Sequence, residues 1–274
     1  MLDISQFRLK LVKAIENNEI TLPTLPEVAL KVRDAAEQEN TTSKDLADII
    51  ATDAAISARL LQVANSPLYR PRTPIDNIQM AVARLGNNLV KSLVTNLAMK
   101  QIYQATTDFM EQKLRKVWED SVNVAAVSKV LAQSLSDIEN EQAMLAGLVH
   151  NIGTLPILTM AEKFSDLTGN EKLLEEIIAT LNPEIGTLIL KAWDFPENLS
   201  SVPTEINKHN RQVSDVDYAD IVMVSRIQLG LENIDDSEWP TITAFERVGL
   251  DAEVNIVDME DTAEDIEAVK QALN

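Results

Sequence analysis

The stretch DLADIIATDAAISARLLQVANSPLY, from Asp45 to Tyr69, decides the fold class of this chain. Its second half places apolar residues three and four positions apart, which is the stripe of a helix that covers a core. The residues of that stripe are Ile56, Leu60, Leu61 and Ala64. A helix is therefore expected from about Asp53 to Asn65.

A second helix is expected directly before it. Thr42, followed three residues later by Asp45, is typical of a helix start. The apolar residues that would then face inward are Leu46, Ile49 and Ile50. Two short helices in succession have roughly the length of a helix-turn-helix. A recognition helix, however, needs basic and polar side chains that reach DNA, and between Asp53 and Asn65 only Arg59 is basic. DNA binding is therefore a weak alternative.

Working outward, helical spacing continues on both sides of one loop. The segment NSPLYRPRTP contains three prolines, which predicts a rigid loop. Further helices are expected at 75–85, 89–103, 107–135, 139–150, 170–180, 183–193 and 215–229. The one strand-like stretch, 254–257, is too short to define a sheet. The sequence thus predicts an all-α protein.

Composition excludes several function classes. The 274 residues include 43 Asp or Glu against 24 Lys or Arg, a formal charge of −19, whereas a generic nucleic-acid binder needs a basic surface. The chain has no cysteine, which removes thiol catalysis and cysteine metal sites, and its two histidines are too few for histidine-rich metal centres. The charged N-terminus is unlike a signal peptide, and no apolar run of about 18 residues is found, so a cytoplasmic protein without membrane contact is expected.

Acidic charge is concentrated at the C-terminal end. Residues 232–274 contain 13 acidic and two basic side chains, a net −11 of the total −19. This bias indicates either a solvated acidic face, which we favour, or an appendage whose helix, around Thr262 to Leu273, packs weakly or binds a basic partner.

His150 lies at the end of the apolar segment AMLAGLVHNIG, where Gly153 can stop a helix. A histidine at this place could be a ligand, a general base or a helix cap, since an imidazolium is favoured at a helix C-terminus. The next residue, Asn151, offers a neutral amide oxygen where a carboxylate would bring negative charge to a divalent metal. A metal site built on His150 and Asn151 would therefore lack the negative charge that a carboxylate provides.

A series of motifs in order resembles the HDOD family, a branch of the HD-domain superfamily. They are LPTLPEVALKV (22–32), the stretch from Asp45 to Tyr69, IDNIQMAVARLG (75–86), AMLAGLVHNIG (143–153), PEIGTLILKAWDFPENL (183–199) and INKHN with His209. The resemblance covers about residues 20–230 and implies an all-helical fold of two packed lobes and a role in bacterial signalling.

The resemblance also implies where a metal would lie in a hydrolytic HD protein. The first histidine corresponds to Asp120, the His-Asp pair to His150 and Asn151, and the closing aspartate to Arg226, so three of the four positions are changed. Arg226 has no lone pair to offer a cation and is expected to pair with Asp120 instead, replacing the metal by a salt bridge.

The register of the last position has an alternative. Asp217 and Asp220 lie on the same expected helix as Arg226, and either could serve as the final ligand if the register slips. The further histidine positions of the family fall on Asn182 and Asn210, leaving only His209. The expected pocket is therefore degenerate, with no metal and no catalytic residue.

A basic segment stands out in this acidic chain. The 42 residues from Arg59 to Lys100 contain six basic side chains and one acid, Asp76. They could receive a nucleotide phosphate or the acidic tail of a partner, with Arg70 and Arg72 as candidate anion-binding residues. The alternative is that they are scattered over several helix faces.

From these observations we expect an HDOD domain over residues 1–231, with an N-terminal helical lobe to about 105 and an HD-like lobe from about 106 to 231, and an acidic extension over 232–274. The expected function is that of a non-catalytic regulatory or scaffolding module without a cofactor. Its partners would be signalling proteins, such as a kinase, receiver or cyclase on separate polypeptides. The alternative is a residual metal-dependent phosphodiesterase or phosphohydrolase.

Overall fold

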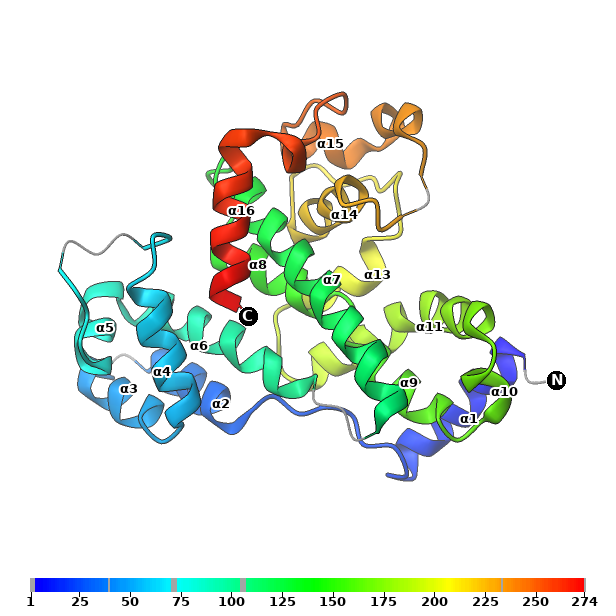
Figure 1. Ribbon diagram of the computed structural model, residues 1–274, viewed down its shortest axis with the longest axis horizontal. Coiled ribbons are helices and arrows are strands. Elements are labelled where there is room, and N and C mark those ends of the chain that lie inside the picture. Colours follow the sequence, from blue (N-terminus) through cyan, green and yellow to red (C-terminus); the bar gives the residue numbers. More distant parts are fainter. Residues whose placement is uncertain (1–2, 39, 70–72, 104–106, 233, 274) are drawn as a thin grey trace.

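The computed structural model describes residues 3–38, 40–69, 73–103, 107–232 and 234–273. Within these ranges the secondary structure consists of sixteen α-helices and two short 3₁₀ helices, with no strand (Figure 1). The all-α prediction is confirmed, and the strand-like stretch at 254–257 leads instead into the 3₁₀ helix η2 (Ile256–Asp258).

The N-terminal lobe contains five helices. They are α2 (Glu27–Ala36), α3 (Ser43–Ile50), α4 (Ala54–Ala64), α5 (Ile78–Leu85) and α6 (Asn87–Ile102). Thr42 and Asp45 form a capping box at the start of α3, as expected. Asp53 caps α4, whose buried stripe includes Val63, while Leu61 is only partly buried.

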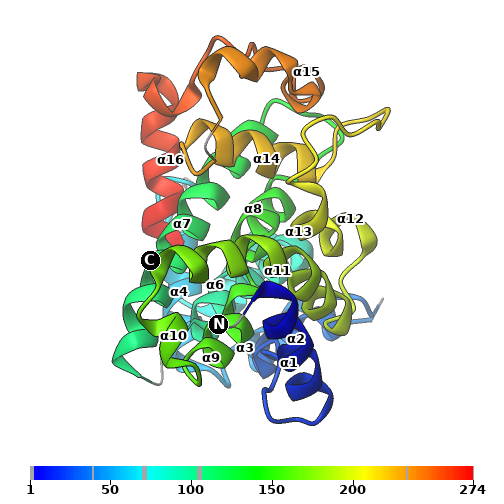
Figure 2. The ribbon, with the colours of Figure 1, turned by 90° about the vertical axis from the view of Figure 1, so that its right-hand side faces the viewer.

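Helix α1 (Ile4–Glu16) does not belong to this lobe. It packs against α11 of the other lobe (Figures 1 and 2). Arg8 donates to Glu184 on α11, and Phe7 lies edge-on to Phe164, which precedes α10, at 6.0 Å between ring centroids. The expected boundary between the lobes at about residue 105 stays a prediction, and α1 lies before that boundary while it contacts α11 after it. The apolar stripe of α1 could not reveal which lobe it covers.

The HD-like lobe is built around two long helices. Its elements are α7 (Asp108–Ala132), α8 (Asn140–Val149), α9 (Thr154–Ala161), α10 (Ser165–Thr168), α11 (Glu171–Ala192), α12 (Glu197–Ser200), α13 (Val202–Glu205) and α14 (Tyr218–Gln228). Helices α7 and α8 lie so close that a Cβ added to Gly147 would come within 2.5 Å of the Ala125 Cα. Glycine at 147 is thus required by this helix contact.

Helix α11 corrects the prediction of two helices at 170–180 and 183–193. It runs without interruption through Pro183. A proline inside a helix costs about 3 kcal/mol because it removes one hydrogen bond and crowds the preceding turn. Both halves bury apolar side chains, and this burial holds the two halves on one axis. The buried apolar residues are Leu174, Ile177, Leu181, Ile185, Ile189 and Leu190.

The acidic C-terminal segment packs on the rest of the chain and presents acidic side chains to solvent, which agrees with the solvated face that we favoured over a weakly packed appendage. It forms η1 (Asp236–Thr241), α15 (Thr243–Val248), η2 and α16 (Glu260–Leu273), and α16 packs on α7 with further contacts to α4 and α6 (Figure 1). Ile266, Val269 and Leu273 are buried on the face of α16 turned to the core. Glu260, Glu264 and Glu267 of α16 are exposed.

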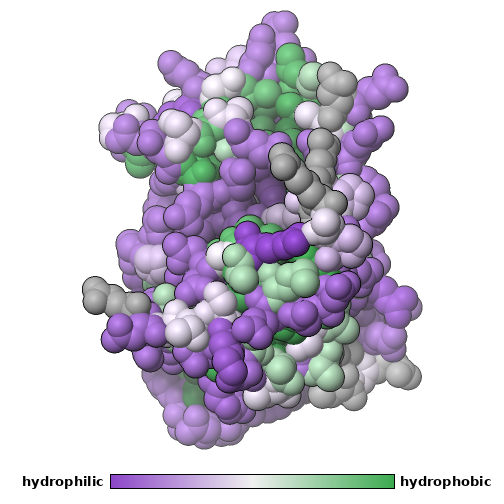
Figure 3. Space-filling view, turned by 90° about the vertical axis from the view of Figure 1, so that its left-hand side faces the viewer, coloured by the Kyte–Doolittle hydropathy of each residue, from purple (hydrophilic) through white to green (hydrophobic). Residues whose placement is uncertain are grey.

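The exterior is mostly hydrophilic on the face shown in Figure 3. Apolar groups gather there in separate patches.

One stretch, Asn140–Ala161, is long and apolar enough to span a membrane, with a mean hydropathy of 1.4. The sequence prediction that the chain has no such stretch is therefore wrong. The stretch forms α8 and α9 at the centre of the lobe, and 89% of its apolar window is buried, which is the pattern of a core segment.

Candidate functional site

A cavity of about 570 Å³ opens in the HD-like lobe among α7, α9, α11 and α14. We call it the HD pocket. Its polar lining comes from Lys113, Lys116, Asp120, Asn151, Thr154, Glu175, Asn182, Asn207 and Arg226. Its apolar lining comes from Val117, Leu158, Leu174, Ile178, Ala179, Ile206 and Leu231. Three of the five residues expected here from the sequence, Asp120, Asn151 and Arg226, line it.

His150 lies behind the pocket wall and is fully buried at the C-cap of α8. Its Nδ1 lies 2.6 Å from the carbonyl oxygen of Gly147, so Nδ1 carries the proton and donates it. Its Nε2 is then a lone-pair acceptor, buried without a hydrogen-bond partner. Burial, and to a lesser extent the positive charge of Arg226, lowers the pKa of His150 to about 3. The expected stabilisation of a helix end by an imidazolium therefore does not apply, because the ring is neutral.

The amides of Asn151 and Asn182 hold the turn after His150 in place. Asn182 Nδ2, on α11, donates to the carbonyl oxygen of His150 at 3.1 Å and to Asn151 Oδ1 at 3.5 Å. A Cβ added to Gly153 would come within 2.5 Å of the Asn182 carbonyl oxygen, so this turn and α11 approach closely. The amide oxygen of Asn151 is thus engaged by a protein donor.

The expected salt bridge between Asp120 and Arg226 does not form. Arg226 Nη1 instead pairs with Glu232 Oε1 at 3.0 Å and donates to Asn207 Oδ1 at 3.1 Å. Asp120 lies 3.4 Å from Lys116 Nζ, one turn earlier on α7. Asp120 and Arg226 line the same pocket. Asp120 pairs there with Lys116, whereas Arg226 pairs with Glu232 and donates to Asn207.

His209 does not line the pocket, contrary to the expectation. Its Nε2 lies 2.8 Å from Glu232 Oε2, so Glu232 joins His209 to the pocket residue Arg226. Glu232 comes just after α14 in the chain, and no sequence signal indicated it. Sequence reasoning missed it because the contact depends on how the chain folds back after the helix.

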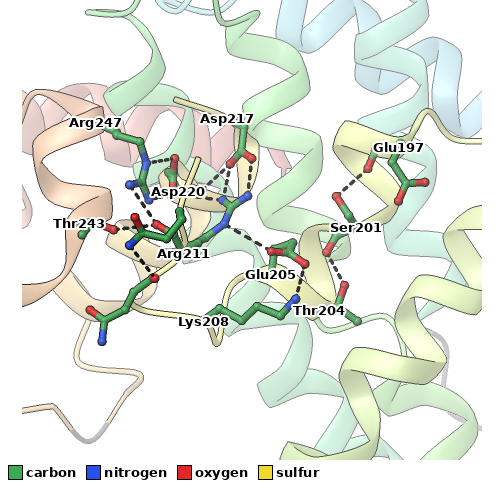
Figure 4. Close-up of polar contacts among 12 residues, drawn as sticks. Glu197, Ser201, Thr204, Glu205, Lys208, Arg211, Asp217, Asp220, Thr243 and Arg247 are labelled. Carbon is green, nitrogen blue, oxygen red and sulfur yellow. Dashed lines mark hydrogen bonds and ion pairs between the residues drawn. The ribbon is translucent and has the colours of Figure 1, made fainter. Parts of the chain in front are cut away.

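Asp217 and Asp220, the alternative candidates for the last ligand, bind arginine side chains (Figure 4). Arg211 binds both oxygens of Asp217 at 2.6 Å, and Arg247 binds the fully buried Asp220 at 2.7 and 2.8 Å. Neither aspartate lines the HD pocket, whereas Arg226 does. Of these three residues, Arg226 is the one that lines the pocket, and the register of the last ligand position stays a prediction.

The basic segment from Arg59 to Lys100 is only partly gathered in space. Arg70 and Arg72 lie outside the described residues. Arg84 donates to the carbonyl oxygen of Thr73 at 3.0 Å and does not line the cavity that Arg59 and Lys100 share. Arg59 and Lys100, however, line one cavity together.

The donor set determines what the HD pocket can do. Among the residues that the structure describes, no group of three His, Cys, Asp or Glu side chains could hold a metal ion. Cations and amides dominate the polar lining, beside an apolar wall. Such a lining suits a small organic molecule with hydrogen-bonding and anionic groups better than a divalent metal.

The depressed pKa of His150 predicts a specific pH dependence. The unfolded histidine takes up a proton near pH 6.5 and the folded one does so only near pH 3, so stability contributed by His150 is lost as the pH falls through this window. Between pH 7 and pH 5 we expect the wild type to lose about 2 kcal/mol more unfolding free energy than His150→Gln. Urea unfolding of both proteins at the two pH values measures this difference. Equal losses would show that His150 is not buried as a neutral ring.

Comparison with known proteins agrees with this fold. The family model of the HDOD domain matches residues 22–209. A crystal structure from Shewanella amazonensis, of a protein named as a candidate metal-dependent phosphohydrolase, is 30% identical, with 100% of both chains covered and a TM-score of 0.88. No curated protein matches.

Two more distant structures share the fold. An HDOD domain protein of unknown function from Geobacter sulfurreducens is 19% identical over 98% of this chain and 99% of its own, with a TM-score of 0.67. A candidate signal transduction protein from Marinobacter aquaeolei is 18% identical over 98% of this chain and 66% of its own, with a TM-score of 0.64. The match over most of the chain, together with the helical lobes and the HD pocket, leads to one conclusion: this protein belongs to the HDOD domain family.

Proposed function

We propose that this protein is a non-catalytic regulatory or scaffolding module of bacterial signal transduction. Its HD pocket is a degenerate relative of a metal centre, and the protein acts through contacts with other signalling proteins. Kinases, receivers or cyclases are the partners we propose. The observation that carries the proposal is the position of Arg226 in the pocket, paired with Glu232 at 3.0 Å.

A divalent metal does not fit the residues present. His150 offers one lone pair at Nε2, Asp120 one carboxylate beside Lys116, and Asn151 an amide oxygen already bonded to Asn182. The guanidinium of Arg226 is a permanent cation close enough to lower the pKa of His150. A metal ion here would meet electrostatic repulsion and too few ligands.

A second candidate function is residual metal-dependent phosphohydrolysis. It is favoured by the 30% identical relative from Shewanella amazonensis, which is named for that activity. The two functions differ in what His150 contributes. In the hydrolase it would be a metal ligand, whereas in the regulatory module it is a buried neutral side chain.

Turnover of a generic phosphodiester separates the two candidates. We expect protein purified without chelator, assayed with added manganese, to show no turnover above that of His150→Ala. The matched control is Lys116→Ala, which alters an exposed pocket residue and leaves His150 in place. Turnover in the wild type and in Lys116→Ala that is abolished in His150→Ala would overturn the regulatory proposal.

A further inference from the structure

A second cavity, of about 400 Å³, lies where α4, the end of α6 and the start of α7 meet. We call it the interlobe pocket, because α4 and α6 belong to the N-terminal lobe and α7 to the HD-like lobe. It is lined by Ala55, Ile56, Arg59, Leu97, Lys100, Gln101, Tyr103, Glu111, Leu114, Arg115 and Trp118. It shares no lining residue with the HD pocket.

The interlobe pocket is positively charged in a strongly acidic protein. Three different helices each bring one cation to it, Arg59 from α4, Lys100 from α6 and Arg115 from α7, against one carboxylate, Glu111. Arg115 and Glu111 pair at 2.8 Å, one turn apart on α7. The formal charge of the lining is therefore +2, in a chain whose total is −19.

Arg59 and Lys100 are close enough to repel each other. Burial and then the positive charge of Arg59 lower the pKa of Lys100, and burial lowers the pKa of Arg59. Arg59 Nη2 donates to the carbonyl oxygen of Leu273 at 2.6 Å, and this neutral acceptor leaves the guanidinium charge in place. An anion bound between Arg59 and Lys100 would relieve the repulsion.

Apolar and aromatic side chains complete the lining of the interlobe pocket. Ile56 on α4, Leu97 on α6 and Leu114 and Trp118 on α7 are all buried there. Tyr103 packs beside Trp118, with 5.3 Å between ring centroids. A ligand that fills this pocket thus needs an anionic end and an apolar or aromatic body.

We propose that the interlobe pocket binds a small phosphate monoester with an aromatic body, such as a nucleoside monophosphate. A phosphate monoester carries a charge of about −1.5 to −2 at neutral pH, which matches the +2 of the lining. Two guanidinium groups favour phosphate, because their planar donors match pairs of phosphate oxygens. A cavity of about 400 Å³ lies within the size range of small-molecule sites.

This position would let a ligand influence the rest of the molecule. Arg59 lines the pocket and also binds the last turn of α16 through the carbonyl oxygen of Leu273. A bound phosphate would therefore lie at the seam of both lobes and beside the docked C-terminal helix. The inference does not depend on whether the HD pocket holds a metal.

Isothermal titration of the full chain with AMP at low salt tests the inference. We expect saturable binding of AMP that weakens at least about tenfold in Lys100→Gln and in Arg115→Gln, because each loses one charge-assisted contact. Arg84→Gln is the matched control, since Arg84 lies outside the pocket, and it should bind as the wild type does. Adenosine, which lacks the phosphate, and inorganic phosphate, which lacks the aromatic body, should each bind at least about tenfold more weakly than AMP.

The contradicting results are equally definite. No binding of AMP or phenyl phosphate at millimolar concentration would overturn the inference. Binding that Lys100→Gln and Arg115→Gln leave unchanged would place the ligand elsewhere and overturn it too. Inorganic phosphate that binds as tightly as AMP would show that the apolar and aromatic lining takes no part, contrary to the proposal.

Discussion

Replacement of Asp220 by alanine is expected to lower the free energy of unfolding by about 3–5 kcal/mol. Asp220 is fully buried at the start of α14, where it accepts hydrogen bonds from Arg211 at 3.1 Å and from Arg247 at 2.7 and 2.8 Å (Figure 4). Removing the carboxylate leaves two largely buried guanidinium groups with less negative charge around them. The effect is large because a charge left in the interior has lost its hydration without compensation.

Urea unfolding at pH 7 measures this loss. The matched control is Asp48→Ala, the same substitution at an exposed carboxylate that pairs with Lys44 one turn away on α3. Exposed pairs of this kind contribute about 0–1 kcal/mol, so this control should remain near the wild type. If Asp220→Ala loses no more unfolding free energy than Asp48→Ala, the claim that the ion pairs of Asp220 with Arg211 and Arg247 stabilise the fold is contradicted.

A methyl group added at Gly147 is expected to destabilise the fold by about 3 kcal/mol. The new Cβ would lie 2.5 Å from the Cα and 2.7 Å from the backbone nitrogen of Ala125, so α7 and α8 must move apart. These helices carry the core of the HD-like lobe, and backbone atoms cannot yield as a flexible side chain would. The midpoint of urea unfolding of Gly147→Ala should therefore fall markedly.

The control for this prediction is Gly169→Ala. A Cβ there meets only the carbonyl oxygen of Ser165, at 3.5 Å, which is an ordinary contact. The two variants share the same intrinsic change in backbone entropy, so their difference reports the helix contact alone. Similar midpoints for both variants would mean that α7 and α8 are not held as closely as described.

The sequence predicted features that depend on neighbouring residues. The capping box of Thr42 and Asp45, the helix ending at Val149 before His150, and the absence of sheet all follow from local spacing and local hydrogen bonds. Local rules failed at Pro183, because the rule that proline ends a helix omits the core against which both halves of α11 pack.

Features that depend on distant parts of the chain were missed. The docking of α16 depends on its contacts with α4, α6 and α7, and the acidic composition of the segment does not reveal that three apolar side chains of α16 are buried. Motif register placed Asp120, Asn151 and Arg226 in one pocket correctly. The ion pair between Arg226 and Glu232 could not be predicted from the sequence. Glu232 follows the end of α14, and it meets Arg226 only because the chain folds back after that helix.

Anomalous X-ray diffraction from crystals grown with manganese tests the central claim most directly. That claim is that the HD pocket lacks the ligands to hold a catalytic metal. We expect no manganese peak within bonding distance of His150 Nε2 or the Asp120 carboxylate. Two bridged manganese ions in this pocket, each with a full set of ligands, would contradict the account.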